Sequence, residues 1–204
     1  MPHPIGPSAD AVLAAKRALR CEVAARVPKA YSTEHAKASA AAGVRLLQSE
    51  TARSAGCIAL YRSLGSEVAT AELASALIAA GKDVCFPAVV EGEAVLHFRR
   101  PHGPSRPSAL GIHEHEDLPG ARVDLAAIDL FVVPARAVDR NGHRLGRGKG
   151  YYDATLAAAG ARARRVCLVF DQQLVDRVPT EAHDARMDAI CTDARWLDLP
   201  ERPS

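Results

Sequence analysis

The segment of this sequence best suited to chemistry is a glycine-rich, cationic stretch at residues 139–153, which reads DRNGHRLGRGKGYYD. Its four glycines allow the backbone to take positive φ angles and to approach a ligand closely. Arg144, Arg147 and Lys149 add positive charges whose donors match the oxygens of a phosphate group. The stretch follows an apolar run and leads into a predicted helix, whose N-terminus would present backbone N–H groups to an anion. These features predict a phosphate-binding loop, and a solvated turn with incidental arginines is the alternative.

The glycine spacing differs from the two common phosphate-binding motifs. A P-loop needs glycine where His143 stands, and serine or threonine where Gly150 stands. A dinucleotide-binding loop needs the spacing G-x-G-x-x-G, whereas residues 146–150 read G-x-G-x-G. The loop therefore predicts an anion site of another kind, beyond the carboxyl end of a strand, where ligands bind in open α/β sheets.

A second group of polar residues lies near the C-terminus, in the sequence PTEAHD at residues 179–184, with Asp188 close behind. Three carboxylates and a histidine within eight residues could bind a hard cation such as Mg²⁺, which prefers oxygen ligands. An ordinary acidic loop is the alternative. Asp153, near the start of a predicted helix, could be a first-turn acid that stabilises the helix dipole.

Two further features are weak when taken alone. Lys16 and Arg20 are four residues apart on the first predicted helix, which by itself predicts no more than a solvated face. Glu67 follows the first predicted strand and has no distinguishing context of its own.

The elements that would position these residues follow from hydrophobic spacing and from capping residues. Helices are predicted over residues 8–27, 33–53, 70–80 and 150–160, the third of them capped by Thr70 and closed by Gly81. Strands are predicted over residues 56–61, 84–86, 94–98, 128–133, 165–170 and 189–191, with Pro87 ending the second. Residues 99–120, rich in Pro, Gly and His, are predicted to be a long loop.

Strands and helices alternate from residue 56 onward, which predicts βαβ units and a mostly parallel sheet. We therefore expect a single three-layer α/β domain over residues 1–204, with helices flanking the sheet and the two N-terminal helices covering one face. Residues 1–7 and 199–204 are expected to be flexible tails. The length of 204 residues suffices for one core without a disulfide or a structural metal.

Composition and charge argue against several classes of protein. The 26 Lys and Arg residues nearly balance the 24 Asp and Glu residues, and a net charge of +2 disfavours a dedicated nucleic-acid binder. No apolar run approaches the length of about 18 residues needed for a membrane span, and the N-terminus lacks the pattern of a secretory signal. The five cysteines are odd in number and form no CxxC pattern, so neither a disulfide framework nor a zinc site is predicted. The expected compartment is the reducing cytoplasm.

Taken together, these segments resemble the 5-formyltetrahydrofolate cyclo-ligase (5,10-methenyltetrahydrofolate synthetase) family over nearly the whole chain. The most specific segment is RLGRGKGYYD at residues 144–153, which fits the pattern RLGxGxGYYD. Weaker segments occur in the family's order at residues 16–20, 58–61, 65–67, 81–87, 96–98, 133–139, 142, 173 and 179–184.

The resemblance implies the cyclisation of 5-formyltetrahydrofolate to 5,10-methenyltetrahydrofolate with ATP and Mg²⁺, releasing ADP and phosphate. Phosphorylation of the formyl oxygen would create a leaving group, and folate N10 would then attack the activated carbon. Such an enzyme is a ligase that forms a C–N bond between atoms of one substrate. We expect it to act on small molecules as a monomer, with no membrane and no obligatory nucleic-acid partner.

The resemblance also implies a role for each matching residue. The residues expected to bind ATP are Lys16, Arg20, Arg144, Gly146, Arg147, Gly148, Lys149, Gly150, Tyr151 and Tyr152. Arg144 and Lys149 are the expected catalytic residues among them. Tyr61, Glu67 and Tyr152 are expected to bind the folate, Glu67 through a hydrogen bond to the pterin. Asp153 and Asp184 are the expected Mg²⁺ ligands.

Three positions depart from the family pattern in the half of the protein that should bind folate. The family motif Gly-Ile-x-Glu-Pro reads GIHEH at residues 111–115, Leu110 stands in place of an aromatic residue, and Val138 in place of a phenylalanine.

Two other functions stay open. One is a catalytically inactive relative that binds nucleotide or RNA through the Arg/Gly loop, and the other is an enzyme acting on a phosphorylated sugar or a CoA thioester. Asp153 and Asp184 disfavour the first, because a polyanion binder gains nothing from carboxylates beside the phosphate.

Overall fold

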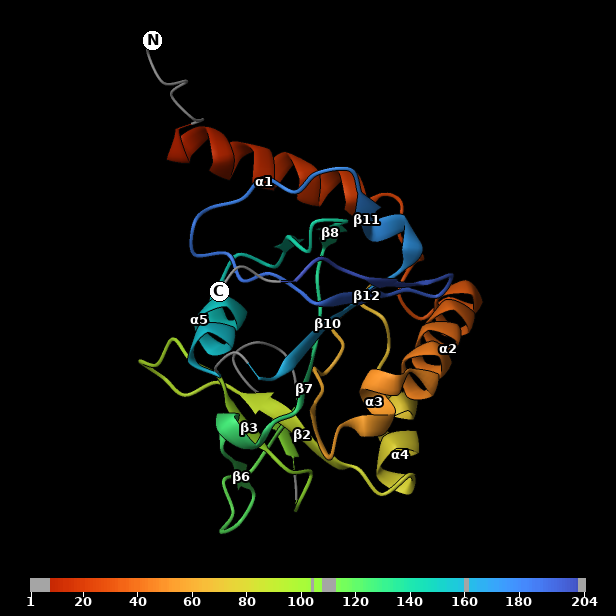
Figure 1. The fold of residues 1–204 in the computed structure, drawn as a ribbon, viewed down its shortest axis with the longest axis vertical. Helices are drawn as coiled ribbons and strands as arrows, with labels where there is room; N and C mark the ends of the chain where they lie inside the picture. Colours follow the sequence, from red (N-terminus) through yellow and green to blue (C-terminus); the bar gives the residue numbers. More distant parts are fainter. Residues whose placement is uncertain (1–7, 104, 108–112, 160–161, 202–204) are drawn as a thin grey trace.

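An eight-stranded sheet forms the centre of the protein (Figure 1), and the computed structural model describes residues 8–103, 105–107, 113–159 and 162–201. The strand order is β13-β12-β10-β7-β1-β2-β3-β6. The five inner strands are parallel, and they are β12 (Ala189–Cys191), β10 (Arg164–Leu168), β7 (Leu130–Val133), β1 (Cys57–Ala59) and β2 (Asp83–Ala88). The outer strands are antiparallel to their neighbours, and they are β13 (Trp196–Asp198), β3 (His97–Arg99) and β6 (Arg122–Val123). The prediction of a mostly parallel sheet is therefore confirmed.

Helices cover both faces of this sheet, which gives the three layers expected from the sequence. On one face lie α2 (Thr33–Gln48), α3 (Glu50–Ser54) and α4 (Ala71–Ala79), and on the other lies α5 (Tyr151–Ala158) (Figure 1). Side chains along β7 alternate between the two cores, so that Leu130 and Val132 face α2 and α4 while Phe131 faces the side of α5. A strand buried on both faces explains the continuous apolar run in the sequence.

A second, smaller sheet lies at one end of the molecule and was not predicted. Its strands are β8 (Ala137–Asp139), β9 (Arg144–Leu145) and β11 (Leu174–Val175), in the order β11-β8-β9. The first helix, α1 (Ala9–Ala24), packs against this sheet through Val23. The prediction that both N-terminal helices cover the central sheet is therefore wrong for α1, which crosses the end of the molecule (Figure 1).

Several predicted boundaries are also wrong, for local reasons. The helix expected over residues 33–53 is two helices, because Ser49 is extended and its hydroxyl accepts the N–H of Ala52 to cap α3. Thr70 does not cap α4 with its side chain, since its hydroxyl donates to the carbonyl oxygen of Tyr61, 2.7 Å away. The strand β2 continues through Pro87, which pairs with β3.

The region predicted to be one long loop contains regular structure. Within residues 99–120, β4 (Ser105–Pro107) pairs with β5 (His113–His115) as an antiparallel hairpin. Leu110 and the first two residues of the GIHEH motif lie outside the described residues. Of the predicted C-terminal tail, Leu199 belongs to the fold, because its N–H donates to the carbonyl oxygen of Asp188 at 3.0 Å.

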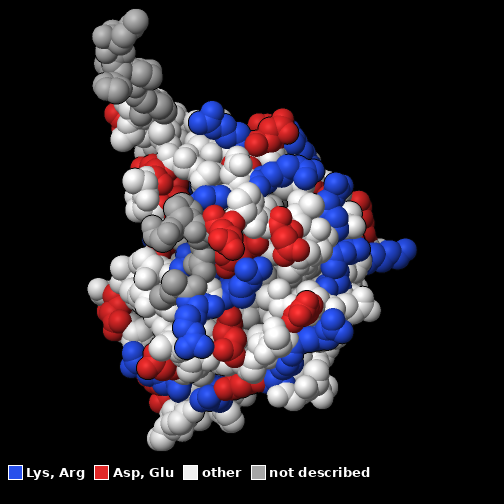
Figure 2. Space-filling view, viewed as in Figure 1, with Lys and Arg blue, Asp and Glu red and all other residues white. Residues whose placement is uncertain are grey.

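The surface agrees with the balanced composition. On the face shown in Figure 2, basic and acidic side chains are interspersed. Over the described ranges, no helix is both long enough and apolar enough to cross a membrane.

Gly142 joins the small sheet to the C-terminal segment, and we predict that alanine there is far more disruptive than at Gly92. Both glycines have φ angles near the left-handed region, +83° and +82°. A Cβ at Gly142 would lie 2.7 Å from the carbonyl oxygen of Met187, whereas a Cβ at Gly92 meets open space. Gly92→Ala should cost about 1–2 kcal/mol of unfolding free energy from backbone strain alone. Gly142→Ala should cost clearly more, as measured by urea unfolding, and equal costs would contradict this packing.

Candidate active site

A cavity of about 520 Å³ opens at the carboxyl ends of the inner strands, between the central sheet, the small sheet and α1. Every residue assigned a site role from the sequence lines it: Lys16, Arg20, Tyr61, Glu67, Arg144, Gly146, Arg147, Gly148, Lys149, Gly150, Tyr151, Tyr152, Asp153 and Asp184. Segments from opposite ends of the chain therefore meet in one place. The individual roles of these residues stay predictions.

Asp139, at the end of β8, fixes the relative position of two walls of this cavity. Its side chain is fully buried, and its Oδ1 accepts the N–H groups of Asn141 at 2.9 Å and His143 at 3.1 Å. Its Oδ2 accepts the N–H of Val178 at 2.9 Å, just before the acidic segment 179–184. One carboxylate therefore ties the turn leading into the glycine loop to the chain leading into the acidic segment.

The glycine loop runs from β9 to the N-terminus of α5. Gly148 and Gly150 have φ angles of +95° and +73°, which side-chain-bearing residues rarely adopt. No side chain of the described residues caps α5, so the first N–H groups of the helix remain available to an anion. The Nε of Arg20 donates to the carbonyl oxygen of Gly146 at 2.9 Å, and this contact joins α1 to the loop.

Lys16 reaches across the cavity from α1 to the acidic segment. Its ammonium donates to Asp184 Oδ2 at 2.7 Å and to Glu181 Oε2 at 2.8 Å. Burial lowers the pKa of Lys16, but these two hydrogen bonds and charges outweigh the burial and hold the pKa above its ordinary value. The ammonium is therefore positively charged, and it neutralises carboxylates that could otherwise bind a cation.

Two arginines of the loop region pair with carboxylates in the same manner. The Nη2 of Arg144 donates to Asp153 Oδ1 at 2.9 Å, and the same oxygen accepts the N–H of Ala185 at 3.0 Å. The Nε of Arg147 donates to Glu67 Oε1 at 2.9 Å. Three of the cations expected to bind ATP, Lys16, Arg144 and Arg147, are therefore paired with the acids expected to bind metal or pterin.

The fold brings together three of the four residues that the acidic segment offered as cation ligands. Ligand atoms of Glu181, His183 and Asp184 lie within 4.8 Å of one another, and Asp153 is not in this group. Asp188 does not line the cavity, because its buried carboxylate accepts a backbone N–H of β10 at 2.8 Å. The fit to Mg²⁺ is good, since two carboxylates supply the oxygens that it prefers and already share one cation, the Lys16 ammonium.

The two tyrosines expected at the folate differ in what they can offer. The hydroxyl of Tyr61 donates to the carbonyl oxygen of Val68 at 2.9 Å, so only its ring is available at the cavity. The hydroxyl of Tyr152 is buried and has no hydrogen-bond partner among the described residues. Burial raises the pKa of both phenols, so Tyr152 presents a neutral hydroxyl that can bind a polar group of a ligand.

Two arginines that line the cavity were missed by the sequence reasoning. Arg136 is half-buried, and its best contact is with Ser66 Oγ at 3.4 Å. Burial and the nearby charges of Arg147 and Arg20 lower its pKa, and all three arginines line the cavity. Arg62 directly follows the predicted strand at residues 56–61. Their position in the sequence could have identified both arginines as site residues, because each follows the carboxyl end of an inner strand. Neither belongs to a motif.

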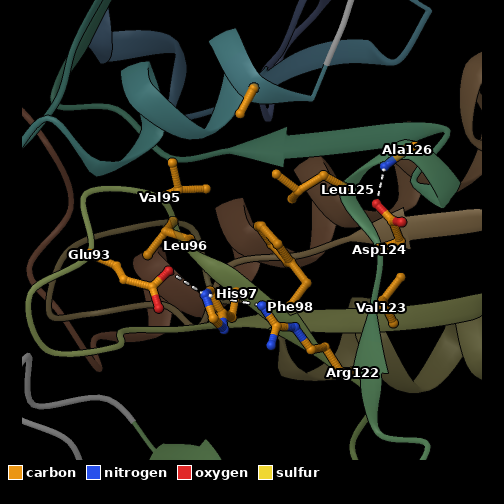
Figure 3. A pocket seen from close by; sticks show the side chains of 11 residues that line it. Glu93, Val95, Leu96, His97, Phe98, Arg122, Val123, Asp124, Leu125 and Ala126 are labelled. Atoms are coloured by element: carbon orange, nitrogen blue, oxygen red, sulfur yellow. Dashed lines mark hydrogen bonds and ion pairs between the residues drawn. The ribbon is translucent and has the colours of Figure 1, made fainter.

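A second cavity of about 650 Å³ lies along β3 and β6 (Figure 3) and has different chemistry. Its charged side chains form hydrogen bonds with one another or with the backbone. Glu93 Oε2 is 2.7 Å from His97 Nε2, with Arg122 next to it, and Asp124 accepts the N–H of Ala126 at 3.0 Å. None of the described residues that line this cavity is a glycine, whereas the glycine loop lines the first cavity.

Comparisons with known proteins agree with the site. The profile of the 5-formyltetrahydrofolate cyclo-ligase family matches residues 12–193. The 5-formyltetrahydrofolate cyclo-ligase of Mycolicibacterium smegmatis is 35% identical over 147 residues, which cover 69% of this chain and 75% of that protein. The mouse (Mus musculus) cyclo-ligase is 25% identical over 90% of this chain and 96% of its own length. The NMR structure of 5,10-methenyltetrahydrofolate synthetase from Aquifex aeolicus has a TM-score of 0.77 and 28% identity, covering 93% of this chain and 95% of that chain.

We predict that Asp139→Asn damages both stability and ligand binding. An asparagine has one acceptor oxygen, so it cannot accept N–H groups on both sides as Asp139 does, and one buried donor is left unpaired at a cost of about 1–3 kcal/mol. Asp129 is the matched control, because it accepts the N–H groups of Gly56 and Cys57 with Oδ2 alone. Urea unfolding and ATP titration should show both losses in Asp139→Asn and little change in Asp129→Asn. Unaltered ATP affinity in Asp139→Asn would contradict its positioning role.

Proposed function

Because the chain belongs to the 5-formyltetrahydrofolate cyclo-ligase family, we propose that it converts 5-formyltetrahydrofolate and ATP to 5,10-methenyltetrahydrofolate, ADP and phosphate, with Mg²⁺. The chain is accordingly an ATP-dependent ligase. One observation carries the proposal: the cationic glycine loop, the α1 cations and the paired carboxylates surround a single cavity. An inactive polyanion binder would have no use for carboxylates among its cations.

The reaction needs charge neutralisation more than it needs a nucleophilic side chain. The formyl oxygen attacks the γ-phosphorus, and the bond from that phosphorus to ADP breaks. Folate N10 then attacks the formyl carbon, phosphate leaves with the formyl oxygen, and the N10 proton is released. Both reacting groups belong to one substrate, so binding in the correct conformation supplies much of the rate.

The side chains around the loop differ in burial, and we assign them different roles accordingly. Lys149 is exposed at the cavity and forms no ion pair with the described residues, so it is free to contact the transferring phosphoryl group. Arg144 is buried and holds Asp153, so we assign it to positioning that carboxylate as well as to charge. Arg20 and Arg136 supply further positive charge beside the loop.

Asp184 and Glu181, with His183, would hold Mg²⁺, and the bound ion would neutralise phosphate oxygens. Lys16 donates hydrogen bonds to both of these carboxylates. The arriving triphosphate gives Lys16 an alternative partner of higher charge. We therefore propose that Lys16 moves from the carboxylates to the phosphates as the metal binds, which couples the binding of ATP to that of Mg²⁺.

We further propose that the protein is a monomer in the reducing cytoplasm. All five cysteines are free thiols, and four of them are buried. Burial raises the pKa of Cys167 and of Cys191 to about 12, so these thiols are unreactive at neutral pH. The exposed large apolar side chains are single residues from separate segments, which supports a monomer.

The assay of the proposed reaction is the appearance of the methenyl chromophore from 5-formyltetrahydrofolate. It should require both ATP and Mg²⁺. Lys149→Met should lower kcat by about 100-fold, the usual effect of removing one group that stabilises transition-state charge. Lys29→Met, at an exposed lysine outside the cavity, is the control and should match the wild-type protein. Chromophore formation without ATP would refute the reaction, and a fully active Lys149→Met would refute the role of Lys149.

Replacing Lys16 should strengthen the binding of Mg²⁺ and weaken the binding of ATP. Without ATP, Lys16→Met should bind Mg²⁺ more tightly than the wild-type protein, because Asp184 and Glu181 lose their competing cation. The same variant should have a KM for ATP raised by about ten-fold, since one charged hydrogen bond to phosphate is lost. Lys37→Met, at an exposed lysine of α2, is the control for calorimetric titration. Unchanged Mg²⁺ affinity in Lys16→Met would contradict the exchange.

A further inference from the structure

Arg62 lines the cavity and has no anionic partner among the described residues. Its guanidinium carbon lies 4.1 Å from the centre of the Phe86 ring, and its Nη2 contacts the Nε2 of His115. Its Nε is buried and has no acceptor among the described residues. Burial lowers the pKa of Arg62, but a guanidinium stays charged in proteins. A half-buried charge without a counter-ion loses part of its hydration without compensation, so this geometry favours an anionic ligand.

His115 cannot supply the missing negative charge. Its Nε2 faces a guanidinium donor and must accept with its lone pair, which is the neutral form of the ring. Burial and the charge of Arg62 both lower the pKa of His115, in agreement with a neutral imidazole. The strand β5 that carries His115 is itself held by Arg99, whose Nη1 donates to the His115 carbonyl oxygen at 3.0 Å. His115 therefore orients the guanidinium, which leaves the remaining donors of Arg62 for a ligand.

The triphosphate is not the best partner for Arg62. Burial and the charges of Arg147 and Arg20 lower the pKa of Arg136, whereas burial alone lowers the pKa of Arg62. The surroundings of Arg62 differ as well. Its guanidinium stacks on Phe86 of β2, and the residues that line the same cavity include the apolar Pro87, Val89 and Leu96. An anion bound by Arg62 should therefore be attached to an apolar or aromatic group.

5-Formyltetrahydrofolate has these two parts in sequence, an aminobenzoyl ring followed by a glutamate. We propose that Arg62, oriented by His115, binds a carboxylate of the glutamate while these apolar residues of the cavity contact the aminobenzoyl ring. The inference rests on the proposed function and identifies a specificity determinant within the same cavity. It also gives a role to one departure from the family pattern, since a proline at position 115 would offer no side-chain acceptor to Arg62.

The test compares two substrates that differ only in the glutamate. The wild-type protein and Arg62→Met are assayed for methenyl formation with 5-formyltetrahydrofolate and with 5-formyltetrahydropteroate, which lacks the glutamate. Methionine retains apolar contact with Phe86 and removes the charge. Arg136→Met is the matched variant, because Arg136 is also a half-buried arginine of the cavity but lies beside Arg20 and Arg147.

In the wild-type protein, loss of the glutamate should raise KM by about ten-fold, as expected for one charge-assisted hydrogen bond. Arg62→Met should raise KM for the folate by a similar factor, leave KM for the pteroate unchanged, and leave kcat nearly unaltered. Arg136→Met should keep the wild-type ratio between the two substrates and should raise KM for ATP instead. Arg62→Lys should recover part of the discrimination, because it restores charge without the planar fork.

Equal KM values for the two substrates in the wild-type protein would overturn the inference while leaving the proposed reaction intact, and this result needs no folded variant. An Arg62→Met protein that loses affinity for both substrates equally, or for ATP alone, would also overturn it. A wild-type protein that converts neither substrate would overturn the proposed function together with the inference. Thermal unfolding of each variant shows whether a change in KM comes from the site or from the fold.

Discussion

The site depends first on the buried carboxylate of Asp139. A fully buried charge must be compensated by hydrogen bonds, and here backbone N–H groups from two distant parts of the chain provide them. The turn after β8 and the segment before residue 179 are therefore held in a fixed relation. Gly142 adds a second constraint, because its carbonyl oxygen accepts the N–H of Met187 at 2.9 Å and leaves no room for a Cβ. The cationic loop and the acidic segment face each other as a consequence of these contacts.

Charge pairing within the cavity follows from that arrangement. Cations and carboxylates placed around one small space would each be destabilised by burial if left alone, and in pairs they stabilise one another. Lys16 with Asp184, and Arg144 with Asp153, are such pairs. In the proposed function, substrate binding is therefore an exchange of partners among these charged groups. The cost of desolvating the charges has been met during folding, which is the usual basis of electrostatic preorganisation.

The sequence predicted those parts of the protein whose signals are local. The glycine loop was recognisable because glycines, arginines and a helix start coincide within residues 139–153, and β7 was recognisable as an apolar run. The small sheet was not, since strands such as Arg144–Leu145 are too short to show any periodicity. The hydroxyl of Thr70 was misassigned because a tertiary acceptor, the Tyr61 carbonyl, competes with the helix N-terminus. Arg62 could be identified only from the fold, which shows a half-buried guanidinium with no carboxylate partner among the described residues.

The central claim is that this cavity moves the γ-phosphoryl group of ATP onto the formyl oxygen of the folate. The most direct measurement uses 5-formyltetrahydrofolate labelled with ¹⁸O in the formyl group and follows the label by mass spectrometry of the released phosphate. The account predicts one labelled oxygen in each phosphate formed together with the methenyl product. Unlabelled phosphate, with the label lost to water, would contradict the account, because the formyl oxygen would then leave without having been phosphorylated.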